Sequence, residues 1–155
     1  MSVYLSPERI RDMLREAGPG VAPPEIRHFQ FIVILADDGD AEKLPTIINA
    51  VMTTLVRRRA TISNVLPPLF LALFGVPFPE NNSAEARRAL VDALLSEHGD
   101  RIRIAHGEAD GPVGIFGKDH LIYGAIIPGL SEILRKLFET QFGIATEIGS
   151  KTPLG

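Results

Sequence analysis

The stretch "FQFIVILAD", from Phe29 to Asp37, decides the fold of this 155-residue chain. Apart from Gln30, residues 29–36 are aromatic, β-branched or aliphatic. A short and nearly unbroken apolar run is typical of a strand buried at the centre of a sheet. The acidic turn that follows, Asp37–Asp40, ends the run. We therefore expect a central strand over Phe29–Ala36.

On either side of this strand, the chain alternates between helix and strand patterns. "PTIINAVMTTLVRRRA", "NNSAEARRALVDALLSEHGD" and the segment that begins at Leu130 carry apolar residues at helical spacing. Apolar or alternating runs predict the remaining strands, which are Thr61–Leu66, Leu69–Phe74, Arg101–His106 and Leu121–Ile127. A Gly-rich hairpin is expected over Gly107–Gly117, and "FGIATEIG" is a candidate for a last edge strand.

This order of elements predicts an α+β fold. It fits a ferredoxin-like, split βαβ sandwich with a mixed, mainly antiparallel sheet and the helices on one face. We expect the domain to span residues 26–148. Residues 1–25 would then form an N-terminal helix and a Pro/Gly linker, and residues 149–155 a C-terminal tail.

Composition excludes several classes of protein. A formal net charge of −3 gives no general attraction to nucleic acid or to anionic lipid. The absence of cysteine excludes disulfides, thiolate metal sites and a cysteine nucleophile. The N-terminus has early charges and no apolar core segment, so it does not resemble a signal peptide. No apolar run is long enough to span a bilayer, and a cytoplasmic location is the default expectation.

Three segments, taken in order, resemble the class III nucleotide cyclase homology domain, the fold of adenylate and guanylate cyclases. The central strand with "AD" at its end looks like the family's opening strand and its metal-binding Asp. "LFLALFGVPFPENNSAEARRALVDALL" looks like the family's strand, "FG-P" corner and helix. "RIRIAHGE" with "GIFGKDHLIYGAIIPGLSEILRKL" looks like its Gly-rich hairpin and the strand, turn and helix that follow. The resemblance covers about residues 29–138 and implies a sheet of the cyclase type.

Only half of the family's metal-binding residues are present in this sequence. The resemblance places its first metal-binding Asp at Asp37, but the turn that should carry the second reads Pro67-Pro68-Leu69. Proline and leucine side chains cannot ligate a metal. The purine-reading Lys falls at Asn64. "ADDGDAEKLP" is also too short for the family's phosphate-binding loop and helix, so two-metal chemistry lacks most of its parts.

The closing helix keeps part of the family's pattern. Pro128 stands where the family has its purine-reading Asp, and the Pro128-Gly129 turn therefore keeps the architecture without the carboxylate. Ser131 stands where the family has Asn, and its hydroxyl can still donate a hydrogen bond. Arg135 matches the family's catalytic Arg. The resemblance thus implies residual catalytic roles for Ser131 and Arg135.

Each of these residues also has a plainer interpretation. Asp37–Asp40 suits an acidic capping turn at a helix N-terminus, which we favour over a residual cation site. Arg135 suits the solvated face of an amphipathic helix. His106 lies on the apolar face of its strand, so a core or interface histidine is favoured over a zinc ligand.

The replacements favour a nucleotide-cyclase-like domain that is catalytically inactive and has a regulatory role, through dimerisation or ligand sensing. One alternative is an active adenylate or guanylate cyclase with a divergent metal site, in which Asp38 or Asp40 supplies the second carboxylate. Another is a ferredoxin-like sensor of a small ligand. We expect no cofactor unless the cyclase is active, in which case it would need Mg²⁺ or Mn²⁺. We expect neither a nucleic acid partner nor membrane insertion.

We also expect a homodimer. The resemblance implies pairing through one sheet face and the hairpin, and the family's active sites form between two chains. The strands that carry Leu35, Phe70, Ala105 and Tyr123 read as apolar on both faces. One helical layer cannot cover both faces, so a second copy would cover the open one.

Overall fold

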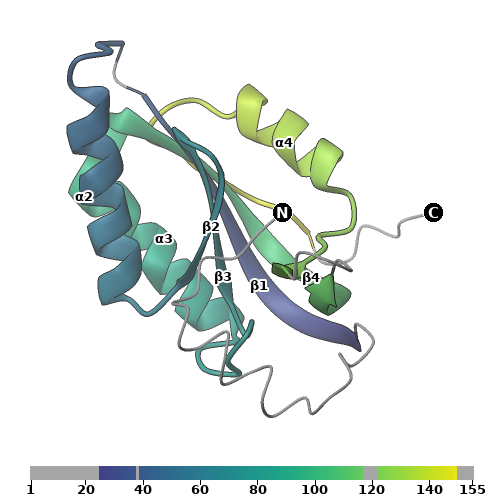
Figure 1. Ribbon diagram of the computed structural model, residues 1–155. Coiled ribbons are helices and arrows are strands. Elements are labelled where there is room, and N and C mark those ends of the chain that lie inside the picture. Colours follow the sequence, from purple (N-terminus) through teal and green to yellow (C-terminus); the bar gives the residue numbers. More distant parts are fainter. Residues whose placement is uncertain (1–24, 38, 117–121, 150–155) are drawn as a thin grey trace.

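The computed structural model describes residues 25–37, 39–116 and 122–149 (Figure 1). Its elements are β1 (Glu25–Ala36), α2 (Leu44–Arg57), β2 (Thr61–Leu66), β3 (Leu69–Phe74), α3 (Ala84–His98), β4 (Ile102–Phe116), β5 (Ile122–Ala125), α4 (Leu130–Glu139) and β6 (Ala145–Glu147). A 3-10 turn, Gly99–Arg101, joins α3 to β4. The helix expected before residue 25 lies outside the described residues, as does the tail after residue 149. No described helix is both long and apolar enough to cross a membrane.

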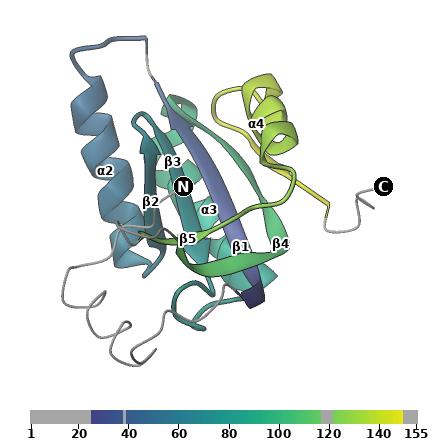
Figure 2. The same cartoon turned by 45° about the vertical axis from the view of Figure 1, so that its right-hand side comes forward.

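The six strands form one sheet in the order β2-β3-β1-β4-β5, with β6 beside β4 (Figure 2). β1 lies at the centre, where Ile32 is opposite Ala72 of β3 and His106 of β4. All these pairings are antiparallel except that of β6, which runs parallel to β4. The α+β class, the mixed and mainly antiparallel sheet, and the last edge strand are therefore as expected.

β4 is longer than the sequence predicts. The segment expected to be a Gly-rich hairpin continues as strand as far as Phe116, and β1 begins at Glu25 because this extension pairs with it. The glycine at 111 permits close packing within the sheet. A Cβ on Gly111 would lie 2.1 Å from the carbonyl oxygen of Ile126, so no larger residue fits there. The prediction of a hairpin over 107–117 is wrong for its first part, and residues 117–121 lie outside the description.

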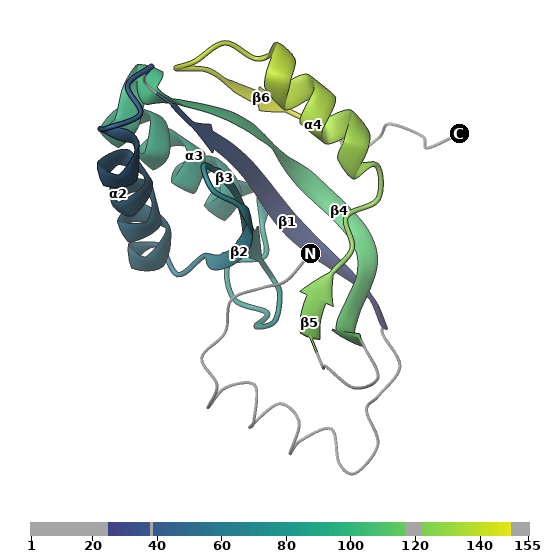
Figure 3. The same cartoon turned by 45° about the horizontal axis from the view of Figure 1, so that its top comes forward.

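The helices cover both faces of the sheet, which corrects the expectation that they share one. α2 and α3 pack against Ile32 and Ile34 of β1 on one face. α4 places Ile133 and Leu137 against Phe31 and other residues that point to the opposite face. Figure 3 shows α4 on the far side of the sheet from α2 and α3. The physical reason is that β1 is apolar on both sides, so one helical layer would leave half of it in water.

Because α4 covers the second face of the sheet, the described apolar residues expected to lie bare on that face are packed against other residues or turned away. Ala105 is buried under α4, and Leu35 packs at the edge of the same cluster. Phe70 points the other way and is buried beneath α2 and α3. The side chain of Tyr123 lies outside the description. Leu35, Phe70 and Ala105 therefore do not form an open surface, and they give no support to a dimer through a bare sheet face.

The position of α4 can be tested by truncating two adjacent residues to alanine. Leu137 is fully buried against the sheet, whereas the next residue, Phe138, is 57% exposed. We expect Leu137→Ala to lower the free energy of unfolding by about 3 kcal/mol, because it leaves a cavity between α4 and β1. Phe138→Ala should change it by less than about 1 kcal/mol. Equal effects of the two variants in urea unfolding would show that α4 does not cover this face.

Candidate functional site

The C-terminal end of β1 lies beside the β2–β3 turn, which is where the family resemblance places a metal centre. The backbone N–H of Ala36 donates to the carbonyl of Pro68 at 3.1 Å, and that of Asp37 donates to the carbonyl of Arg101 at 2.8 Å. These two bonds fix the start of the acidic turn. The Asp37 carboxylate then accepts a hydrogen bond from the N–H of Gly39 at 2.8 Å. Asp37 thus closes a local turn. It does not cap a helix as expected, because α2 has Lys43 as its N-cap residue and no side-chain cap bond.

The donor atoms that the structure describes at this end of the sheet do not fit a two-metal centre. The turn that faces Asp37 is formed by Pro67 and Pro68, whose side chains hold no ligand atom. The carboxylate of Asp40 accepts from the N–H of Glu42 at 2.9 Å, so it also caps its own turn. Within residues 25–37, 39–116 and 122–149, no three His, Cys, Asp or Glu side chains are grouped to hold a metal ion.

α4 carries the other two residues that the sequence singles out. The helix follows Gly129, whose φ of +72° explains why glycine occupies that turn. Ser131 is exposed in its first turn. Arg135 lies on the exposed face and forms ion pairs with Glu132 and Glu139. The hydrogen bond from Arg135 lowers the pKa of the Glu132 carboxyl and raises the pKa of Arg135 itself, so both stay charged.

One chain does not bring Asp37 and Ser131 together. The N-terminal end of α4 lines a cavity of about 460 Å³ with His28 and Asp110, at the opposite end of β1 from Asp37. At about 3.3 Å of rise per strand residue, His28 and Asp37 are roughly 30 Å apart. Any site that used both Asp37 and the start of α4 would therefore need two chains.

A buried polar cluster lies between α3 and the sheet, and sequence reasoning did not predict it. Its centre is Arg87, which is only 3% exposed. Arg87 donates to Gln30 of β1, to Nδ1 of His106 at 3.0 Å, and to Glu147 of β6 at 2.9 Å. Arg88 also donates to Glu147, at 2.7 and 3.0 Å. The cluster joins α3 to three strands and holds β6 against β4.

The signal for this cluster was present in the sequence. Arg87 precedes Leu90 and Val91 by three and four residues, which places it on the buried stripe of α3. An arginine on such a stripe needs buried partners. Gln30, the one polar residue inside the apolar run of β1, is one of them. His106 is buried and hydrogen-bonded, which agrees with its interpretation as a core histidine.

The cluster shifts the titration of two of its members. Burial, with a smaller effect of the Arg87 charge, lowers the pKa of the His106 imidazole to about 4. Hydrogen bonds from Arg88 and Arg87 lower the pKa of the Glu147 carboxyl to about 2. At neutral pH the histidine is therefore neutral and accepts from Arg87, while Glu147 is ionised between two arginines.

The sequence itself matches no family model and no curated protein. The structure is similar to solved cyclase domains. The guanylyl cyclase Cya2 gives a TM-score of 0.58 at 14% identity, over 80% of this chain and 76% of that one. The adenylyl cyclase CyaB from P. aeruginosa gives 0.54 at 17%, over 78% and 77%. The monomeric guanylyl cyclase domain of the RhoGC fusion protein from Blastocladiella emersonii gives 0.63 at 9%, over 80% and 82%.

The protein therefore has the fold of the class III adenylyl and guanylyl cyclase catalytic domains, and the resemblance seen in the sequence is confirmed at the level of the fold. Identities this low carry no information about activity. The RhoGC domain has been seen as a monomer and as a dimer, so the fold alone does not fix the oligomeric state.

The polar cluster predicts how stability depends on pH. The imidazole of His106 takes up a proton near pH 6.5 when unfolded but only near pH 4 when folded. The free energy of unfolding should therefore fall by about 2–3 kcal/mol as the pH drops from about 6.5 to about 4. Urea unfolding at several pH values measures this fall.

Two glutamine variants isolate the contribution of His106. His106→Gln keeps an acceptor for Arg87 but cannot titrate, so most of the fall between pH 6.5 and 4 should disappear. His28→Gln removes a histidine that is half exposed on β1, and it should leave the fall in place. If His106→Gln shows the same pH dependence as the unchanged protein, the imidazole is not held neutral by the cluster.

Proposed function

We propose that this protein is a cyclase-like domain that does not make cyclic nucleotide and that acts as a regulatory, dimerising module. The observation that carries the proposal is the Pro67-Pro68 turn, whose carbonyl bonds to the end of β1 beside Asp37. The place where a second metal-binding carboxylate is needed holds a side chain without a ligand atom. We expect that the protein requires no metal cofactor.

The remaining residues support the same conclusion. Two-metal catalysis needs both carboxylates to hold the ions around the reacting phosphate, and losing one raises the barrier by several kcal/mol. Asp37 and Asp40 are each engaged in a hydrogen bond within their own turn. Arg135 is bound to two glutamates on its own helix, which reduces its use as an electrostatic stabiliser of a transferred phosphate.

The absence of activity can be tested directly. We expect purified protein incubated with ATP or GTP and Mn²⁺ to yield no cyclic nucleotide above a blank without protein. Asp37→Ala should give the same result, as should the control Asp100→Ala, which removes an exposed carboxylate in the turn before β4. Turnover that is lost in Asp37→Ala but kept in Asp100→Ala would overturn the proposal and establish the divergent active cyclase.

The described surface offers one apolar region suited to a homodimer. Ile26 and Ile126 are 69% and 50% exposed. They lie on either side of Pro112, which is opposite Ile26 in the sheet and whose carbonyl accepts from the N–H of Ile126. This apolar group, which we call the arm, lies where the start of β1, the middle of β4 and the residue after β5 adjoin. It is near the segment that the sequence places at the interface. Its burial against a second copy would remove these side chains from water.

A charge on the arm should prevent this pairing. We expect the unchanged protein to sediment as a dimer at micromolar concentration and Ile126→Lys to sediment as a folded monomer. Ile144→Lys is the matched control, because Ile144 is 48% exposed at a distant loop before β6. This control should remain a dimer. A stable monomer of the unchanged protein, or equal effects of both lysines, would contradict a dimer through the arm.

A further inference from the structure

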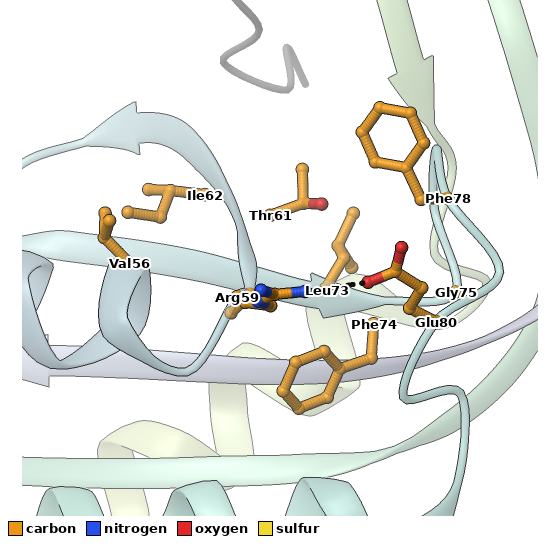
Figure 4. Close-up of a pocket in the computed structure, with 10 residues that line it drawn as sticks. Val56, Arg59, Thr61, Ile62, Leu73, Phe74, Gly75, Phe78 and Glu80 are labelled. Atoms are coloured by element: carbon orange, nitrogen blue, oxygen red, sulfur yellow. Dashed lines mark ion pairs between the residues drawn. The ribbon is translucent and has the colours of Figure 1, made fainter.

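A second cavity lies away from the position of the lost metal centre. It has a volume of about 510 Å³ and lies between the end of α2, the start of β2 and the loop after β3 (Figure 4). Thr61 and Leu73, which line it, pair at the open end of the β2–β3 hairpin. The Pro67-Pro68 turn is at the other end of the same hairpin, so this cavity is separate from the site already described.

Two opposite charges meet in this cavity. The guanidinium of Arg59 lies 3.8 Å from the carboxylate of Glu80, and both side chains are largely exposed. Figure 4 shows them extending toward each other from opposite sides of the cavity. The rest of the wall is mixed, and its apolar residues include Val56, Leu73 and Phe78. Val56 is 64% exposed and Phe78 is 37% exposed, so a bound apolar group would remove both from water.

The backbone holds Arg59 in a conformation that favours glycine. α2 ends with hydrogen bonds from the N–H of Arg59 to Val56 and from the N–H of Ala60 to Leu55, which is the pattern of a Schellman motif. The left-handed position of that motif is occupied by Arg59, with φ of +60°. A side chain there is strained by about 1 kcal/mol relative to glycine. This helix end fixes the direction of the Cα–Cβ bond of Arg59.

The loop that carries Glu80 is also anchored. Asn81 adopts φ of +60°, and its carbonyl accepts from the N–H of Ser83 at 2.8 Å. Asn82 donates to the carbonyl of His28 on β1 at 2.9 Å. Ser83 caps α3 by accepting from the N–H of Ala86. The two charged groups therefore project from fixed backbone, which reduces the entropy lost when a ligand binds between them.

We propose that this cavity binds a small zwitterion, namely a free α-amino acid with an apolar side chain. Its carboxylate would pair with Arg59, its ammonium group with Glu80, and its side chain would contact Phe78. An exposed ion pair contributes little to stability, so separating Arg59 from Glu80 costs little if each gains a new partner. A simple anion would face Glu80 and a simple cation would face Arg59, whereas a zwitterion satisfies both.

This inference does not depend on whether the protein is a cyclase, since the cavity shares no residue with the Asp37 end of the sheet. Isothermal titration calorimetry with L-leucine and L-phenylalanine tests it. We expect at least one of them to bind. N-acetyl-leucine, which lacks the ammonium group, and leucinamide, which lacks the carboxylate, should each bind at least tenfold more weakly than L-leucine. The cyclase assay is a separate measurement, so the two proposals can fail independently.

Variants of the two charges provide the second part of the test. Arg59→Gly should weaken binding at least tenfold while raising the urea midpoint, because glycine relieves the strain at the helix end. Glu80→Gln should also weaken binding at least tenfold. Arg58→Ala is the matched control: it removes the neighbouring arginine, which does not line the cavity, and it should bind as the unchanged protein does.

Three outcomes would overturn the inference. The first is the absence of heat with millimolar L-leucine and L-phenylalanine. The second is equal binding of L-leucine and N-acetyl-leucine, which would indicate a site for anions. The third is equal weakening by Arg58→Ala and Arg59→Gly, which would indicate a general effect of positive charge.

Discussion

The burial of β1 on both faces is the constraint on which the rest of the structure depends. Residues 29–34 of this strand are all nearly inaccessible to water. A strand in that position must be flanked by other strands and covered by a layer on each side. β3 and β4 flank it, α2 and α3 cover one face, and α4 covers the other. The short helix α4 is therefore as necessary to the core as the two longer ones.

The same constraint accounts for the polar cluster. Gln30 lies within the buried part of β1, where an unpaired amide would cost a few kcal/mol. Arg87 donates to the amide oxygen of Gln30 and then needs partners for its remaining N–H groups, which His106 and Glu147 supply. A single polar residue in an apolar strand thus leads to a network that reaches the last strand of the sheet. Because Glu147 lies on β6, the cluster also determines where the C-terminal part of the domain is held.

Local patterns in the sequence were sufficient for much of this fold. The bounds of β2 and β3 agree with the prediction, because a proline pair ends one strand and begins the other. The prediction placed α4 on the wrong face of the sheet, because the apolar stripe of a helix does not determine which face of a sheet the helix packs against. The length of β4 was missed because Gly111 reads as a turn residue, whereas its role is to let the carbonyl of Ile126 approach. The charged cavity could not be predicted either, because Arg59 and Glu80 are brought together only by the pairing of β2 with β3.

The two ends of the β2–β3 hairpin differ in what the fold requires of their residues. At its closed end, Pro67 and Pro68 complete the turn, and the carbonyl of Pro68 accepts a bond from the N–H of Ala36 in β1. At its open end, Arg59 stands where glycine would be more stable by about 1 kcal/mol. Its exposed ion pair with Glu80 stabilises the folded state by at most about the same amount. The charge of Arg59 also interacts favourably with the C-terminal end of the α2 dipole, by up to about 1 kcal/mol. These two contributions offset the strain, so the case for a ligand rests on the arrangement of Arg59 and Glu80 across the cavity.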